Sequence, residues 1–268
     1  MKKILLLFII SVAFLSCEKE QHLVTWSNDV PLLTRVMFDD ESYNEYTYTD
    51  ASQISEEKSR FFYTKHTYDN ENRLVKSEFY MDPAMFSSSS VIIAEAMKRK
   101  EWVNAGNTSK SLTKTYEYKD NGQLNRINFI RPAVNDSEYS RYTWENNRIS
   151  KQSMYRKGLL SGYIDFLYDD RGNLIKETKY LVLSSGIAEL SNTSEYEYDY
   201  MGNPFRSFKG LAIPGKYTNP NNITKVTYTL HFEVNQWTQK VQITTYSYKY
   251  NTDGYPVKVN GEVEYVYQ

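Results

Sequence analysis

The chain has 268 residues, with 32 basic and 33 acidic side chains for a net charge of −1, and 25 tyrosines against 12 phenylalanines. Because lysine and arginine are not in surplus, the sequence lacks the electrostatic footprint of a nucleic-acid-binding protein, and no nucleic-acid partner is expected. The length suits one large all-β domain. The excess of tyrosine over phenylalanine predicts sheet faces that are aromatic but wet.

The first 16 residues have the pattern of an export signal. Lys2 and Lys3 give a positive start, and residues 4–14 form an apolar run that is too short to span a bilayer. Ser16 then provides a small residue before Cys17, the only cysteine in the sequence. We therefore expect residues 1–16 to be a signal peptide.

The residues before the cysteine resemble the lipobox, at which bacterial lipoproteins are cleaved and then acylated on the new N-terminal cysteine. The match is Phe14-Leu15-Ser16-Cys17, although the family usually has leucine in place of Phe14. The resemblance implies lipidation of Cys17, a lipidated N terminus and tether over residues 17–32, and a membrane as one partner. The alternative is an ordinary secretory signal with an incidental cysteine.

A short frame recurs from residue 46 onward. Two aromatic residues stand at alternate positions, followed by a glycine or small polar residue four places after the second, and an apolar residue or proline six places after it. The copies are Tyr46/Tyr48/Ser52/Ile54, His66/Tyr68/Asn72/Leu74, Tyr116/Tyr118/Gly122/Leu124, Phe166/Tyr168/Gly172/Leu174, Tyr196/Tyr198/Gly202/Pro204 and Tyr248/Tyr250/Gly254/Pro256. Alternation indicates a strand with unlike faces, and the residue four places on suits a turn, so each copy predicts a β-hairpin with a return strand.

Two further hairpins are expected outside the frame. Residues 142–153 form a seventh unit with a shorter turn at Asn146-Asn147. An eighth is predicted with Asn235-Gln236 as a two-residue turn, which would place Tyr228 opposite Ile243 and Leu230 opposite Val241 on one apolar face.

One insert, residues 82–110, breaks the pattern. Four serines, 87–90, precede a segment whose apolar residues are spaced as in a helix, and Asn104-Ala105-Gly106 can end it. The insert contains Trp102, whose ring is not explained by sheet packing. We expect a short helix in a loop, with Trp102 among the contacts of a binding partner.

Counting outward and return strands gives roughly 14 to 18, and sheets of this size curl, split or close. We therefore predict an all-β fold over residues 33–268: an antiparallel up-and-down meander of hairpins, curled or closed into a wide barrel-like sheet, with one short helical insert. The tight turns should share one end of the sheet. Longer connections should gather at the other end: 82–110, 131–137, 156–162, 184–192 and 209–222.

The frame resembles the YD repeat of RHS proteins, which runs Tyr-x-Tyr-Asp, a turn ending in glycine, one residue and leucine. Tyr168-Asp169 with Gly172 and Leu174 is the best copy, whereas Tyr118 is followed by Lys119. The likeness covers roughly residues 40–268 and implies a hairpin array. Taken with the lipobox, the chain is similar to uncharacterised Gram-negative envelope lipoproteins of porin-like or barrel-like β fold. That resemblance implies a cell-envelope location, at the periplasmic or surface side of the outer membrane, and supplies no catalytic residues.

No group of residues in the sequence matches a known catalytic or metal-binding motif. His22, His66 and His231 lie far apart without ligand spacing, and His66 occupies an aromatic position of its frame, where a sheet-face residue is expected. Asp169 and Asp170 are an acidic pair, but they stand where a turn calls for aspartate. We therefore expect no metal and no cofactor. The predicted function is a non-enzymatic binding or structural module for a protein or glycan partner; the alternative is a glycoside hydrolase or other polysaccharide-active enzyme, whose carboxylates pair only in space.

The lipobox gives the first testable prediction. Replacement Cys17→Ser removes the acylated sulfur, so the protein should move from the membrane fraction to the soluble fraction after cell lysis. Immunoblotting of the two fractions measures the change. Unchanged membrane partition, or an uncleaved N terminus in mass spectrometry, would contradict lipidation.

Overall fold

The computed structural model describes residues 30–38, 42–87, 89, 90, 92, 108–132, 134, 136–208, 210, 211, 213–231 and 240–268. Within these residues the fold is all-β, with two short 3-10 turns, η1 (Pro83–Phe86) and η3 (Pro204–Ser207), and no helix long and apolar enough to cross a membrane. The strands are β1 (Leu33–Met37), β2 (Tyr43–Tyr48), β3 (Ile54–Lys58), β4 (Phe62–Tyr68), β5 (Leu74–Met81), β6 (Ser109–Tyr118), β7 (Leu124–Ile130), β8 (Glu138–Glu145), β9 (Arg148–Arg156), β10 (Leu159–Tyr168), β11 (Leu174–Val182), β12 (Ala188–Gly202), β13 (Asn221–Leu230), β14 (Val241–Thr245), β15 (Tyr248–Tyr250), β16 (Pro256–Val259) and β17 (Val263–Tyr267).

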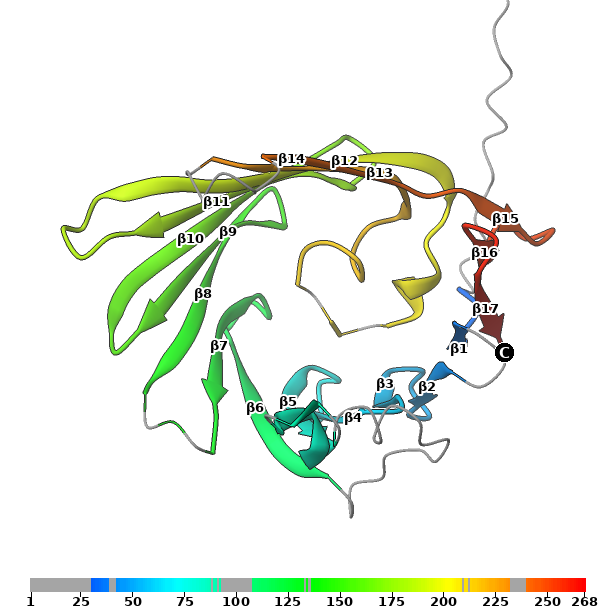
Figure 1. Ribbon diagram of the computed structural model, residues 1–268, viewed down its shortest axis with the longest axis horizontal. Coiled ribbons are helices and arrows are strands. Elements are labelled where there is room, and N and C mark those ends of the chain that lie inside the picture. Colours follow the sequence, from blue (N-terminus) through cyan, green and yellow to red (C-terminus); the bar gives the residue numbers. More distant parts are fainter. Residues whose placement is uncertain are drawn as a thin grey trace, which may run out of the picture.

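The strands form one antiparallel sheet that follows chain order and curls around an interior (Figure 1). β17 pairs with β1, so strands from the two ends of the described chain lie side by side. β14 and β15 are consecutive segments that pair on different sides, β14 with β13 and β15 with β16, and the sheet is not closed there. The predicted meander and its strand number are confirmed.

Five hairpins that carry the frame share a five-residue turn, which explains the third member of the frame, the glycine or small polar residue. The turns are 49–53, 69–73, 119–123, 169–173 and 251–255, and in each the first residue exchanges backbone hydrogen bonds with the fourth and fifth. The fourth residue has positive φ, from 56° at Ser52 to 97° at Gly172. Glycine adopts this conformation without strain, and asparagine tolerates it better than most residues.

Each of these hairpins also carries a bulge beside its second aromatic residue. In the β4–β5 hairpin, Tyr68 lies opposite Leu74 while Thr67 lies opposite Lys76, so one residue of the return strand has no counterpart. The ladder to the next hairpin stops at the same level: β5 and β6 pair only as far as Lys76 and Thr115. Beyond it, the Tyr118 hydroxyl donates a 2.8 Å hydrogen bond to the Leu74 carbonyl oxygen.

This side-chain clasp recurs around the sheet. An inward aromatic side chain bonds a carbonyl at the start of the preceding return strand, whose residue is mostly fully buried. The clasps are Tyr48 to Leu33 at 2.7 Å, Tyr68 to Ile54 at 2.7 Å, Tyr118 to Leu74 at 2.8 Å, Trp144 to Leu124 at 2.8 Å, Tyr168 to Ile149 at 2.8 Å, Tyr198 to Leu174 at 2.5 Å, Tyr248 to Ile223 at 2.8 Å and Tyr267 to Pro256 at 2.6 Å. The clasp provides a side-chain hydrogen bond between neighbouring hairpins where their backbone ladder ends.

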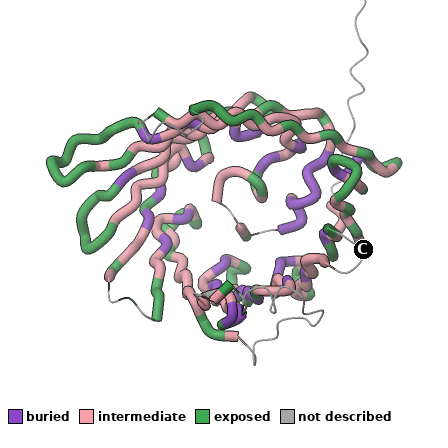
Figure 2. The backbone as a smooth tube through the Cα atoms, in the orientation of Figure 1, coloured by how far each residue is buried: buried purple, intermediate pink, exposed green. Residues whose placement is uncertain are grey.

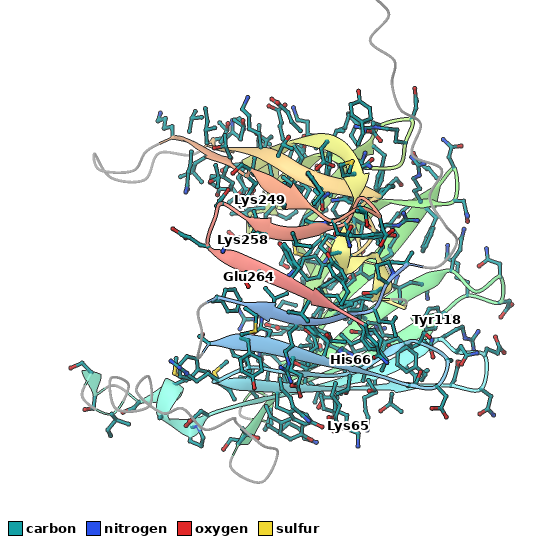
Figure 3. The ribbon with its side chains drawn as sticks, turned by 90° about the vertical axis from the view of Figure 1, so that its right-hand side faces the viewer. Lys65, His66, Tyr118, Lys249, Lys258 and Glu264 are labelled. Atoms are coloured by element: carbon teal, nitrogen blue, oxygen red, sulfur yellow. The ribbon has the colours of Figure 1, made fainter. Side chains whose placement is uncertain are left out.

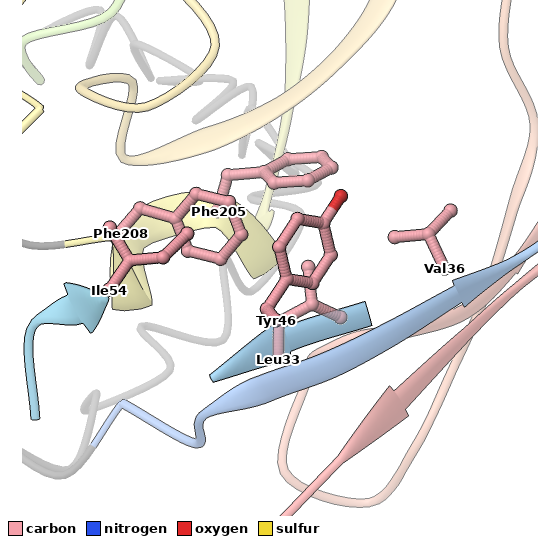
Figure 4. Packing of buried hydrophobic residues seen from close by; sticks show 6 residues of the cluster. All are labelled: Leu33, Val36, Tyr46, Ile54, Phe205 and Phe208. Carbon is pink, nitrogen blue, oxygen red and sulfur yellow. The ribbon is translucent and has the colours of Figure 1, made fainter. Parts of the chain in front are cut away.

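The fifth frame does not form a hairpin, which corrects the sequence prediction. β12 continues to Gly202, and the described residues of segment 203–220 then lie inside the curl, where Figure 2 shows a buried stretch followed by one of mostly intermediate burial. Phe205 and Phe208 pack on Leu33, Tyr46 and Ile54 of one wall (Figure 4). Farther along the segment, Ile213 packs on a second cluster: Leu124, Ile127, Tyr142 and Ile149.

Hydrogen bonds from asparagine side chains fix this interior segment. The Asn203 amide donates to the carbonyl oxygens of Lys216 and Asn219 at 2.7 and 2.8 Å. The Asn219 side-chain oxygen accepts from the Leu174 backbone N–H at 2.9 Å. The prediction that segment 209–222 lies with the longer connections at the other end is wrong: its described residues connect the strands at the tight-turn end, where the Gly202 N–H donates to the Gly254 carbonyl oxygen at 3.1 Å.

Two other predicted connections are also shorter than expected. Between β9 and β10 lies the two-residue turn Lys157-Gly158, with both φ values positive, and between β11 and β12 only residues 183–187 intervene. In both strand pairs the register continues to the turn, with Arg156 opposite Leu159 and Val182 opposite Ala188.

The β13–β14 register differs by one residue from the prediction. Tyr228 lies opposite Gln242, and Ile243 lies opposite Thr227. Tyr248 must point inward to form its clasp, and side-chain alternation from it places Gln242 inside and Ile243 outside, where it is 59% exposed. The predicted turn at Asn235-Gln236 lies outside the described residues, as does the predicted helix within 91–103 except for Ile92, which is helical.

The clasp predicts an effect on stability. Tyr118→Phe removes the hydroxyl and leaves the Leu74 carbonyl without this bond, so the free energy of unfolding should fall by about 1–3 kcal/mol. Tyr155→Phe is the matched control, because that ring lies on the outer face, and its effect should stay within about 0.5 kcal/mol. Denaturant unfolding followed by circular dichroism measures both. Equal losses in the two variants would contradict the clasp.

The inward tyrosines also predict the response to alkali. Burial raises the pKa of Tyr48, Tyr116 and Tyr118 to about 12, whereas an unfolded tyrosine titrates near about 10. The folded state thus keeps protons that the unfolded chain releases. Stability should be intact below about pH 10 and decline as the pH rises through about 12. Tyrosinate absorbance and circular dichroism should change together; full ionisation with an intact β spectrum would contradict this.

Candidate functional site

The two site residues predicted from sequence, Cys17 and Trp102, lie outside the described residues. Their roles as lipid anchor and partner contact therefore stay predictions. The described residues offer three places where chemistry could occur: the inner face of the sheet, the acidic turns and the outer face.

The inner face holds a hydrogen-bonded chain centred on His66 of β4, a residue labelled in Figure 3. The His66 Nε2 lies 3.1 Å from a Glu57 carboxylate oxygen, and its Nδ1 lies 2.9 Å from the Ser77 hydroxyl, which in turn lies 3.1 Å from the Tyr116 hydroxyl. Acid, histidine and serine in this order are the parts of a hydrolytic triad. Ser77 is 0% exposed, however, so no substrate can reach its hydroxyl.

The chain of groups is therefore a satisfied polar network within the sheet. The prediction that His66 is a sheet-face residue is confirmed. The inner face also holds Lys114, whose ammonium lies 4.7 Å from the Phe79 ring centre. Desolvation by burial lowers the pKa of that ammonium.

The acidic pair Asp169 and Asp170 serves its turn, as predicted. The Asp169 carboxylate accepts hydrogen bonds from the backbone N–H and side-chain amide of Asn173 at 2.7 and 3.0 Å. Although partial burial opposes ionisation, these bonds keep the pKa of Asp169 below its usual value. Asp170 is exposed.

No pair of buried carboxylates faces a cleft in the part of the chain that the structure describes. The buried carboxylate there is Asp82, 6% exposed, and it caps η1 by accepting from the Ala84 N–H at 2.9 Å. Across the same residues no three histidine, cysteine or acidic side chains gather as metal ligands.

The outer face of β8–β11 carries two stacked pairs of tyrosine rings. Tyr139 and Tyr155 lie opposite each other with ring centres 4.7 Å apart and planes 10° apart. Tyr163 and Tyr180 repeat the arrangement at 4.6 Å and 21°. Alternation places these rings on the face opposite the buried Ser140 and Tyr142. Their hydroxyls make no hydrogen bond to any residue that the structure describes, in contrast to the inward clasps.

Cationic side chains lie against these rings. The Arg126 guanidinium is 3.8 Å from the Tyr139 ring centre, and that of Arg141 is 5.7 Å from the centres of both Tyr139 and Tyr155. The Lys151 ammonium lies 4.2 Å from the Tyr163 ring centre and pairs with Asp165 at 3.1 Å. We name these seven residues the outer tyrosine surface: Tyr139, Tyr155, Tyr163, Tyr180, Arg126, Arg141 and Lys151.

A hollow of about 400 Å³ adjoins this surface at the end of the sheet opposite the turns of the frame. Tyr139 and Tyr155 line it together with the inward residues Met154 and Leu181. The surface thus passes into a depression at the rim of the sheet. Sequence reasoning missed it, because these tyrosines lie outside the frame and only the pairing between hairpins brings them together.

No family model matches the sequence, and no curated protein matches it. Among solved structures, the chain is similar to a porin-like protein from Bacteroides uniformis (TM-score 0.40, 15% identity, 88% of this chain and 98% of that one). It is also similar to a porin-like protein from Bacteroides vulgatus (TM-score 0.39, 11% identity, 88% and 99%). A match to TcdB2-TccC3 (TM-score 0.31, 13% identity) covers 85% of this chain and 10% of that one. Identities this low carry no function across, and the fold described above rests on its own strand registers.

Proposed function

We propose that the protein is a cell-envelope lipoprotein, anchored through Cys17, whose curled sheet is a non-enzymatic binding module for a protein or glycan partner. The observation that carries this proposal is the outer tyrosine surface. Its four rings make no clasp, yet they are held in two stacked pairs with three cations against them.

The contrast between the two faces supports the choice of the outer one. On the inner face, residues of segment 203–220 pack against the wall of the sheet and its clasping tyrosines. That part of the inner face is therefore already covered. Outside, aromatic rings and guanidinium groups are the side chains most often found at the centres of binding surfaces. Trp102 stays a second predicted contact, outside the described residues.

The proposal predicts binding without turnover. In the full-length protein, Tyr155→p-benzoylphenylalanine places a photo-crosslinker on the outer tyrosine surface, and the same replacement at Lys258, on β16 (Figure 3), is the matched control. In parallel, affinity electrophoresis through gels containing soluble polysaccharides tests for a glycan. We expect either one defined crosslink that is specific to position 155 or retardation by a polysaccharide, with no release of reducing ends.

Two outcomes would contradict the proposal. Release of reducing ends from a retarding polysaccharide would mean a hydrolase. Absence of both a position-specific crosslink and retardation would mean that the surface binds neither class of partner.

A further inference from the structure

The outer tyrosine surface contains a charge arrangement that folding alone does not favour. Arg126 on β7 and Arg141 on β8 lie directly opposite each other on the outer face. Like charges in this position destabilise a sheet. Elsewhere the outer face pairs opposite charges in register, as in Lys176 with Glu195 at 2.8 Å.

The one comparable like-charge pair in the described registers is compensated. Lys249 lies opposite Lys258, but the ammonium of Lys258 forms a 2.8 Å ion pair with Glu264 on the next strand (Figure 3). This pair thus has a neighbouring carboxylate to reduce its repulsion.

The two arginines are compensated less closely. Glu117 on β6 lies opposite Arg126 in register, but its carboxylate oxygen is 4.0 Å from the Arg126 Nε and already accepts a 2.7 Å hydrogen bond from the Asn128 side-chain amide. The Arg126 Nε is buried and has no hydrogen-bond partner, while the side chain as a whole is 29% exposed. Arg141 is exposed and forms no ion pair with any residue that the structure describes. Five donors on each guanidinium call for acceptors from outside.

The arginines begin a row that crosses five strands. In register, Arg126 faces Arg141, Arg141 faces Ser153, Ser153 faces Tyr163 and Tyr163 faces Tyr180. Four strand spacings make the row roughly 19 Å long. Two cations, a small hydroxyl residue and two aromatic rings thus follow one another in a line perpendicular to the strands.

We propose, building on the proposed binding function, that this row binds a polysaccharide whose acid groups are carboxylates. The planar guanidinium accommodates a carboxylate with two parallel hydrogen bonds, and the tyrosine rings offer apolar contact to sugar rings. A β-strand of an acidic protein fits less well, because β8, β9 and β10 are each paired on both sides and present no free edge.

Polygalacturonate is the probe, its fully methyl-esterified form is the neutral match, and polyglutamate is the acidic peptide match. Full-length protein should bind polygalacturonate, and Arg141→Gln should weaken that binding about tenfold. Arg126→Gln combined with Arg141→Gln should weaken it further. Lys249→Gln, which changes the other like-charge pair, should leave affinity unchanged.

Thermal unfolding separates binding from structure. Because Arg141→Gln removes a repulsion, its melting temperature should equal or exceed that of the wild type while binding falls. Should the double variant unfold, the single variant still decides.

Equal affinity of wild type and Arg141→Gln, or equal affinity for the ester or for polyglutamate, would overturn the assignment. If polygalacturonate does not bind while position 155 still crosslinks one protein, the carboxylate glycan is wrong and the binding module stands. If position 155 forms no specific crosslink and no polysaccharide, polygalacturonate included, retards the protein, both proposals fail.

Discussion

The structure depends on the hydrogen bond from an inward aromatic side chain to a carbonyl at the start of the neighbouring return strand. That carbonyl lies where a bulge and the end of the ladder interrupt regular pairing, and a buried carbonyl without a partner is costly. Tyr118 and Trp144 supply the bond with different chemistry, a hydroxyl and an indole N–H, over the same distance of 2.8 Å. The requirement is thus a donor at the end of a rigid ring. In most frames the second aromatic residue makes the clasp and is tyrosine, whereas phenylalanine and histidine occur only at the first position; in the sixth frame the first residue, Tyr248, makes the clasp.

The clasp gives the two faces of the sheet different roles. Because the clasping rings fill the inner face with hydroxyl-bearing aromatics, that face packs against the polar and aromatic segment 203–220 instead of an aliphatic core. The side chains of Asn203, Asn219 and Asn173 form hydrogen bonds with backbone groups that fix this segment against the sheet. The outer face needs no clasp, and its side chains are free to vary in ways that the fold does not dictate.

What could be read from the sequence was what a single hairpin encodes. The positive φ at Gly122 and Gly172, the alternation of Tyr116 and Tyr118, and the buried Leu74 and Leu124 are all local consequences of the frame. Relations between hairpins were not accessible in the same way. The fifth frame satisfies the spacing, but Pro204 begins η3 instead of a return strand. The β13–β14 register was predicted from its own apolar pattern, whereas Tyr248, farther along the chain, decides it. The row from Arg126 to Tyr180 likewise depends on four registers at once.

The β17–β1 pair has a consequence for how the molecule assembles. Leu33 lies opposite Tyr267 with the same one-residue shift seen in the hairpins, so the pair reproduces a repeat unit that has no turn. The turn therefore only links the two strands of a unit along the chain. The register and the clasp define the unit. Because its halves are more than 200 residues apart, this unit carries the largest loop-closure entropy in the sheet, which grows only slowly with length, and its contacts are the most non-local. Neighbouring hairpins can form as the chain emerges, but this junction must wait for the last strand. A circularly permuted chain, joined at this junction and opened at another turn, would keep every strand pairing of the sheet. Its last pairing step would then occur between two different strands.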